Sequence, residues 1–248
     1  MLAVLLLIAQ TAPSVEPPTD PQARLSECIV LAAQNPKLGE VAAGRWRSEG
    51  GGYRARRCLG VAYANQERFS SAAAAFEEAA RESEGARDAK SAEIWAQAGN
   101  AWLAAGEPAK ARAALDAALA SGSLVGLALG EAHLDRARAR VAGGDHDGAR
   151  ADLDRALNFA ADDPLSWLLS ATLARRTGDR ARARKDIDEA LRRAPDDASV
   201  QLEAGNIAVS ERDEAKARAA WTRVIELAPG SAMAESARQA LGQFGAEQ

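Results

Sequence analysis

Hydrophobic and polar residues follow a helical period along most of the chain, and the stretch 164–197 shows the pattern well. Apolar residues recur there at the spacing of one helix face, first in Trp167, Leu168 and Ala171 and then in Ala183, Ile187 and Ala190. Asp163 and Pro164 suit the N-cap and first position of a helix, Gly178 suits a left-handed helix end, and Pro195 ends the pattern. The stretch therefore predicts two helices joined by a short turn.

The same pattern returns every 34 residues. Gly-Asp-His-Asp-Gly-Ala at 144–149 is followed by Gly-Asp-Arg-Ala-Arg-Ala at 178–183 and by Arg-Asp-Glu-Ala-Lys-Ala at 212–217. Units are predicted at 53–86, 92–125, 130–163, 164–197 and 198–231, with short insertions after the first two. Because a helical hairpin buries only one of its two apolar faces internally, each unit must stack on its neighbours, which predicts a solenoid.

The period and the residue types resemble those of the tetratricopeptide repeat family. The family's aromatic residue near the start of the first helix is matched by Trp95 and Trp167, and its small residue of the second helix by Ala72, Ala111, Ala149, Ala183 and Ala217. Arg56 and Gln201 replace the aromatic residue in two units, and Arg212 replaces a turn Gly. The resemblance covers about residues 53–231. It implies an all-α, right-handed α-solenoid of about five helical hairpins.

The whole chain divides into five predicted segments. These are a signal peptide at 1–12, a Pro-rich linker at 13–21, a degenerate helical pair with a Gly linker at 22–52, the repeat domain at 53–231, and a capping helix with its tail at 232–248. The pair is expected as helices over Gln22–Asn35 and Lys37–Trp46, and the cap as an amphipathic helix over Ser231–Phe244. A solenoid needs such a cap because its last repeat would otherwise expose an apolar face.

The amino-acid composition favours helices over strands and argues against nucleic acid as a partner. Aromatic residues make up only 4% of the chain while hydrophobic residues reach 47%, and the difference is mostly alanine, leucine and valine. This favours closely packed helices over strands. The net charge of −4 and the pI of about 5.4 offer no basic surface for DNA or RNA, so we expect no nucleic acid among the partners.

A short apolar run, Met1 to Ala9, is followed by small and polar residues. The run is too short to cross a bilayer as a helix, but it fits a secretory signal cleaved near Thr11 or Ala12. No Lys or Arg precedes it, so a start of the chain that is not a signal stays open as the alternative. We expect a periplasmic or secreted protein with no integral membrane segment in the mature chain. The alternative compartment is the cytoplasm.

Cys28 and Cys58 are the only cysteines. An even number in an exported chain predicts one disulfide, and the alternative is a pair of buried free thiols. Zinc is not expected, because no Cys-x-x-Cys pair occurs and both histidines, His133 and His146, lie far from the cysteines.

No nucleophile elbow, metal-ligand cluster or paired base and nucleophile occurs in the sequence. We therefore expect no catalytic residue, no metal, no cofactor and no enzymatic activity. His133 is predicted to be a packing or solvated histidine, and His146 to lie exposed in a turn. Two acidic pairs are spaced i, i+2 and are predicted to be solvated surface, namely Asp152 with Asp154 and Asp186 with Asp188.

In the family that the chain resembles, the first helix of each hairpin lines a concave groove that receives an extended peptide or a partner helix. The resemblance places groove residues at Arg57, Asn65, Asn100, Arg138, Thr172, Arg175, Arg176 and Asn206. Asn100 and Asn206 each follow Ala-Gly, where the family uses Asn to bind a peptide backbone. The alternative is that Asn simply tolerates a half-exposed helix position. The three arginines of the later units predict a locally positive wall that suits acidic and apolar side chains.

The sequence thus predicts a scaffold of the cell envelope that binds a partner protein or peptide in its groove. Two alternatives come from other classes of protein. One is a structural subunit that self-associates through its terminal caps, and the other is an enzyme whose site has no recognised motif. An apolar outer face on the C-terminal helix would favour self-association, whereas a polar face would favour a plain cap.

Overall fold

The computed structural model describes residues 20–246, and these residues form thirteen helices and no strand. Their bounds are α1 Pro21–Gln34, α2 Pro36–Ser48, α3 Gly52–Ala64, α4 Phe69–Gly85, α5 Ser91–Ala104, α6 Pro108–Ala120, α7 Gly126–Ala142, α8 His146–Phe159, α9 Pro164–Thr177, α10 Arg180–Arg193, α11 Ala198–Ser210, α12 Glu214–Leu227 and α13 Ala232–Ala246. The five predicted units correspond to the pairs from α3–α4 to α11–α12. The predicted signal peptide, 1–12, lies outside the described residues.

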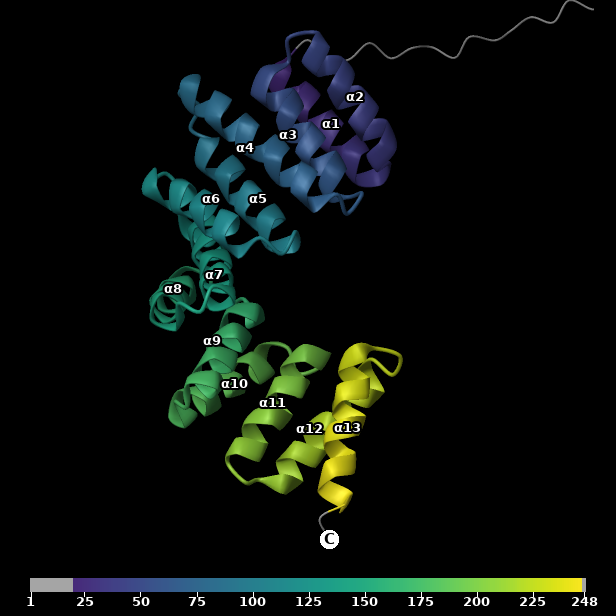
Figure 1. Ribbon diagram of the computed structural model, residues 1–248, viewed down its shortest axis with the longest axis vertical. Coiled ribbons are helices and arrows are strands. Elements are labelled where there is room, and N and C mark those ends of the chain that lie inside the picture. The colour runs from purple at the N-terminus through teal and green to yellow at the C-terminus, as the bar shows by residue number, and fades with distance from the viewer. Residues whose placement is uncertain (1–19, 247–248) are drawn as a thin grey trace, which may run out of the picture.

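The helices stack in chain order along an arc (Figure 1). Helices α1 to α6 form its upper part, α7 to α10 its middle, and α11 to α13 its lower end. The first helices of neighbouring pairs also contact one another, α5 with α7 and α9 with α11. We call the surface formed by α3, α5, α7, α9 and α11 the groove wall. The predicted all-α, right-handed α-solenoid is confirmed.

The first helix of a pair has a defined start and ends in a turn whose geometry is common to all pairs. Asp163 accepts hydrogen bonds from the backbone N–H groups of Leu165 and Ser166 at 3.0 and 3.2 Å, and thereby caps α9. Gly178 ends α9 with a φ of 83°. A residue with positive φ occupies this place in all five pairs, namely Glu67, Gly106, Gly144, Gly178 and Arg212. The left-handed turn therefore persists where Gly is replaced, at a conformational cost.

Small residues let the two helices of a pair approach closely. Gly60 of α3 faces Phe76 of α4, and a methyl group on Gly60 would lie 2.6 Å from the Phe76 ring. Gly99 faces Leu115 and Gly205 faces Trp221 in the same way. The small residue predicted in each second helix is fully buried at Ala72, Ala111, Ala149, Ala183 and Ala217. A chain with few aromatic residues thus builds a core from close backbone contact.

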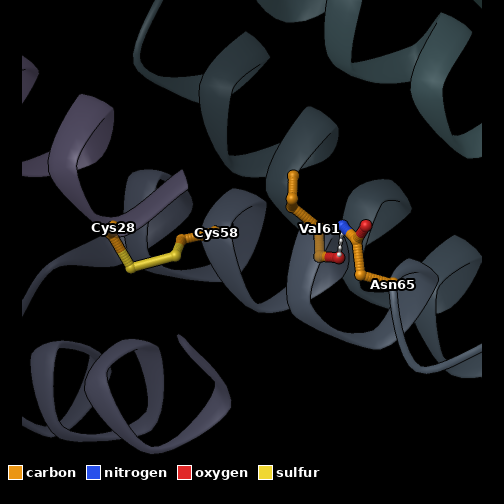
Figure 2. Close-up of a disulfide and its surroundings, with 4 residues drawn as sticks. All are labelled: Cys28, Cys58, Val61 and Asn65. Carbon is orange, nitrogen blue, oxygen red and sulfur yellow. Dashed lines mark hydrogen bonds between the residues drawn. A yellow bond between two sulfur atoms is a disulfide. The ribbon is translucent and has the colours of Figure 1, made fainter. Parts of the chain in front are cut away.

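A disulfide joins Cys28 of α1 to Cys58 of α3 (Figure 2). The two Cα atoms are 5.9 Å apart, inside the limit of about 7 Å for a bridge. Both cysteines are buried, and they pack in one cluster with Leu25, Trp46 and Leu59. The bridge closes a loop of 30 residues and fastens the N-terminal helical pair to the first repeat.

Helix α13 closes the other end of the solenoid. Its residues Ala234 and Ala237 are buried, whereas Glu235, Arg238 and Gln239 are exposed. This polar outer face is the one expected of a plain cap. Within residues 20–246, no helix is both long enough and apolar enough to cross a membrane.

Candidate functional site

The predicted groove residues lie on the groove wall. Their positions are Arg57 on α3, Asn65 at the C-cap of α3, Asn100 on α5, Arg138 on α7, Thr172, Arg175 and Arg176 on α9, and Asn206 on α11. Asn65, Asn100, Arg138 and Arg176 are exposed, and the other four are partly buried. None of the eight side chains is enclosed in the core, so each keeps some access to a ligand.

A hollow of about 340 Å³ opens on the groove wall between α5 and α7, and we call it the α5–α7 hollow. It brings Arg57 and Asn100 together with Glu93, Glu131 and Asp135. The Asn100 side chain donates a hydrogen bond from Nδ2 to Asp135 at 3.0 Å, and Arg57 Nη2 lies 3.8 Å from the Glu93 carboxylate. Two predicted residues thus line one polar concavity.

A second hollow of about 330 Å³ lies between α7 and α9, and we call it the α7–α9 hollow. It brings together Arg138, Thr172 and Arg176. The rest of its lining is apolar, from Ala137, Val141, Ala142, Leu153, Leu169 and Leu173. Thr172 donates its hydroxyl hydrogen bond to the Leu168 carbonyl at 2.9 Å, so its hydroxyl donor is used within α9. This hollow suits an apolar side chain beside guanidinium groups.

Asn65, Arg175 and Asn206 lie in neither hollow. The Asn65 amide donates to the Val61 carbonyl at 2.9 Å, as Figure 2 shows. Arg175 of α9 grips the carboxylate of Glu203 in α11 with two hydrogen bonds of 2.6 and 3.1 Å. Asn206 donates to the same carboxylate at 3.3 Å. These side chains are engaged within the wall itself.

The expectation of a locally positive wall is wrong along most of its length. Arg138 Nη1 lies 2.9 Å from Asp135, and Arg175 is paired with Glu203. Arg176 is the one of the three predicted cations that has no ion-pair partner within residues 20–246. The compensating carboxylates come from the preceding helical turn and from the next repeat, and the prediction did not take them into account.

Two carboxylates expected on the surface are buried. Asp152 on α8 is 0% exposed and Asp186 on α10 is 2% exposed, so the prediction that they are solvated is wrong. The i, i+2 argument correctly separates each from its more exposed neighbour, Asp154 or Asp188, but it does not say which of the two faces inward. The usable signal is that Asp152 and Asp186 stand 34 residues apart and so hold the same repeat position.

Asp152 is compensated by three side chains of α7. Its Oδ1 contacts His133 Nδ1 at 2.9 Å, and Arg136 reaches both carboxylate oxygens at 2.7 and 2.8 Å. Arg140 Nη1 lies 3.1 Å away. Burial raises the pKa of the Asp152 carboxyl, but the hydrogen bonds from His133 and Arg136 and the charges of Arg136 and Arg140 outweigh it and bring the pKa to about 2. Asp152 is therefore an ionised structural residue.

The histidines match their predictions in placement. His133 is buried and packs against Asp152, and His146 is exposed at the start of α8. Within the part of the chain that the structure describes, no group of three or more His, Cys, Asp or Glu side chains is arranged to hold a metal ion.

Comparison with known families identifies the class of protein. Residues 58–124, 96–164 and 168–232 match the model of the family described as tetratricopeptide repeat. These matches span well over half of the chain, so the chain belongs to the tetratricopeptide repeat family. A comparison with curated proteins gives no match.

Several solved structures share the fold. Pseudomonas aeruginosa pilF is 16% identical with a TM-score of 0.70, and the alignment covers 92% of this chain and 99% of pilF. PilW, described as a widely conserved type IV pilus biogenesis factor, is 19% identical with a TM-score of 0.71, covering 86% and 97%. YrrB, described as a TPR protein with an unusual peptide-binding site, is 17% identical with a TM-score of 0.56, covering 75% and 91%. At these identities the likeness concerns the fold.

Proposed function

We propose that the chain is a non-catalytic scaffold that holds an extended segment of a partner protein on its groove wall. The observation that carries this proposal is that the α5–α7 and α7–α9 hollows gather Arg57, Asn100, Arg138, Thr172 and Arg176, five of the eight groove residues. Exposed amide and guanidinium groups beside an apolar floor can bind both the backbone and the side chains of such a segment. The peptide-binding site named for YrrB supports the same use of this fold.

The groove is tested by filling it. Ala128 is exposed and lines the α5–α7 hollow, so Ala128→Trp should occupy that space. Ala151 is an exposed alanine of α8, outside the groove wall, so Ala151→Trp is the matched control. In crosslinking pull-downs from the native compartment, the first variant should lose the proteins captured by the wild type, and the control should keep them. Equal capture by both variants, with equal thermal stability, would contradict binding on the groove wall.

We further propose that the protein works in the cell envelope. A buried disulfide is typical of proteins that mature in an oxidising compartment, and PilW is described as a pilus biogenesis factor. The intact mass of the protein purified from its native host tests this. A mature chain that begins near residue 12 and contains the disulfide is expected. A full-length chain with two reduced thiols would contradict the proposal.

Self-association through the caps is the second candidate, and one observation favours it. Val30, Leu38 and Val41 on α1 and α2 are 53%, 54% and 68% exposed. The opposite cap, α13, has a polar outer face, so two copies cannot stack head to tail through apolar faces. The apolar surface on α1 and α2 instead suits a symmetric dimer. Sedimentation of the wild type and of Val41→Lys tests it. A dimer that the substitution dissociates would support this candidate, and a monomeric wild type would remove it.

A further inference from the structure

The two hollows of the groove wall share helix α7 but differ in charge. The α5–α7 hollow sets three carboxylates, Glu93, Glu131 and Asp135, against the single guanidinium of Arg57. The α7–α9 hollow contains two guanidinium groups and no carboxylate. One face of α7 is thus acidic towards its start and basic towards its end. This asymmetry depends on charged residues that the repeat pattern does not require.

In the acidic hollow, Glu131 is the carboxylate that remains available. Asp135 already accepts hydrogen bonds from Asn100 at 3.0 Å and from Arg138 at 2.9 Å, and Glu93 pairs with Lys90 at 2.9 Å and lies 3.8 Å from Arg57. Glu131 is exposed, and its side chain forms no ion pair or hydrogen bond within the described chain. It stands one helical turn from Asp135 on the same face of α7. A cationic side chain entering this hollow would meet both carboxylates.

In the basic hollow, Arg176 is the free cation. Arg138 is turned towards Asp135 and so marks the border between the two hollows. Arg176 is exposed at the end of α9, without an ion-pair partner among residues 20–246. Between these arginines, Val141, Leu169 and the other apolar lining residues form a floor. The hollow therefore suits an apolar side chain that is followed by a carboxylate.

We propose that the partner segment carries a Lys or Arg for the α5–α7 hollow, an apolar side chain for the α7–α9 hollow, and a carboxylate that pairs with Arg176. This inference rests on the proposed function and states which chemistry the groove selects. Glu131 and Val141 are ten residues apart on α7, which corresponds to about 15 Å along the helix axis. An extended chain covers this distance with four or five residues. The basic and apolar residues should therefore be separated by at least that spacing.

Binding of this kind should be weak and sensitive to salt. Each exposed ion pair is expected to change the affinity by up to about fivefold, and added salt reduces the effect. The proposal therefore concerns selectivity between partner segments, and the experiment compares affinities within matched sets.

Three synthetic ten-residue peptides test the assignment. Each consists of Gly and Ser with one Leu, a charged residue four positions before the Leu and a second charged residue two positions after it, so that all three side chains lie on one face of the extended peptide. The charged residues are Lys then Glu in the mixed peptide, Lys twice in the basic peptide and Glu twice in the acidic peptide. Dissociation constants are measured by fluorescence anisotropy for the wild type, Glu131→Lys and Arg176→Glu. Both substituted side chains are exposed and unpaired within the described chain, so both variants should fold.

The wild type should bind the mixed peptide several-fold more tightly than either of the others. Glu131→Lys should abolish the advantage of the mixed over the acidic peptide and keep its advantage over the basic one. Arg176→Glu should do the reverse. Equal binding of all three peptides, selectivity that neither substitution changes, or no binding of any peptide would each overturn the charge assignment. The groove itself is tested separately, by capture of the native partner with Ala128→Trp, so a wrong charge assignment can be distinguished from a wrong binding surface.

Discussion

The carboxyls of Asp152 and Asp186 hold the same position in successive repeats, and both are buried between the two helices of their repeat. Each is bonded by the residue that stands 16 positions earlier, on the first helix of the same pair. Arg136 holds Asp152, and the Ser170 hydroxyl donates to Asp186. In these two repeats the buried carboxylate is therefore matched by a donor from the first helix.

The other repeats lack both partners of this pair. In the fifth unit the two positions are Ala204 and Ala220, and in the second they are Ala98 and Ala114. Ala204 and Ala220 line a hollow of about 570 Å³ between α10, α11 and α12. Donor and acceptor thus occur together or are absent together, as expected when an unpartnered buried carboxylate is costly.

Replacing Asp152 tests its ionised state. Its folded pKa of about 2 lies below the ordinary value of about 3.9 for an unfolded chain, so ionisation stabilises the fold. Asp152→Asn should lower the free energy of unfolding at neutral pH by about 2–3 kcal/mol. This contribution is complete above pH ~4 and is lost as the pH falls towards 2, so the difference between variant and wild type should shrink in that interval. Urea titrations across pH 2.5–6 measure it.

Asp188→Asn is the control for that experiment. Asp188 lies two residues beyond Asp186, is exposed, and forms no ion pair or side-chain hydrogen bond within the described chain. Its replacement should change stability by less than about 0.5 kcal/mol at any pH. A difference for Asp152→Asn that stays constant down to pH 2.5 would show that the carboxylate is not the stabilising species.

Signals that act within a few residues predict the helices of this fold well. Contacts between helices are the part that the sequence does not predict. The bounds of α9 follow from Asp163, Pro164 and Gly178, which act through bonds within a few residues. The burial of Asp152 depends on Arg136 in another helix, and the neutralisation of Arg175 depends on Glu203, 28 residues away. A helical period specifies which positions face inward only when apolar residues mark the face. Polar residues on that face, and charges shared across repeats, therefore escape a sequence-based prediction.

Gly60 should not tolerate a side chain. In an ordinary helix Gly→Ala stabilises by about 0.5–1 kcal/mol, but a methyl group at Gly60 would lie 2.6 Å from the buried Phe76 ring. Gly60→Ala should therefore destabilise the protein, by about 1–3 kcal/mol. Gly44, in the interior of α2, has open space where a methyl group would be added, with no atom within 4 Å apart from its chain neighbours and the backbone of its own helix, so Gly44→Ala should stabilise the protein. Thermal melts compare the two, and a shift in the same direction for both would contradict the packing argument.

Replacing Arg212 by Gly should stabilise the turn between α11 and α12. Arg212 has a φ of 63°, whereas the equivalent residue of the preceding repeat is Gly178, with a φ of 83°. A left-handed conformation costs an L-residue about 1–2 kcal/mol, part of which is offset by the greater flexibility of Gly when unfolded. We expect Arg212→Gly to raise the free energy of unfolding by about 0.5–1 kcal/mol and Gly178→Ala to lower it by about 1 kcal/mol. Chemical denaturation of the two variants should show these opposite signs.

Removing the disulfide should loosen the N-terminal pair. In the chain-entropy account, closing a loop of 30 residues stabilises the folded state by about 3–4 kcal/mol. Cys28→Ala combined with Cys58→Ala should therefore speed amide hydrogen exchange in α1 and α2 while leaving α9 to α12 unchanged, since contacts in a solenoid are between neighbours. Unchanged exchange in α1 and α2 would show that packing alone holds the pair.

The pair of Ser170 and Asp186 should be coupled in a double-mutant cycle. Ser170→Ala removes a donor from a carboxylate that stays buried, with only Arg182 Nε, at 3.2 Å, left to bond it. That single change should cost about 1–3 kcal/mol. Ser170→Ala with Asp186→Ala recreates the alanine pair of the fifth repeat and leaves no buried acceptor, while Arg182 keeps its ion pair with Asp154. The double variant should therefore lose less stability than the sum of the two single variants, by at least about 0.5 kcal/mol. Strict additivity, measured by urea denaturation at neutral pH, would show that donor and carboxylate act independently and that their joint occurrence in two repeats has another cause.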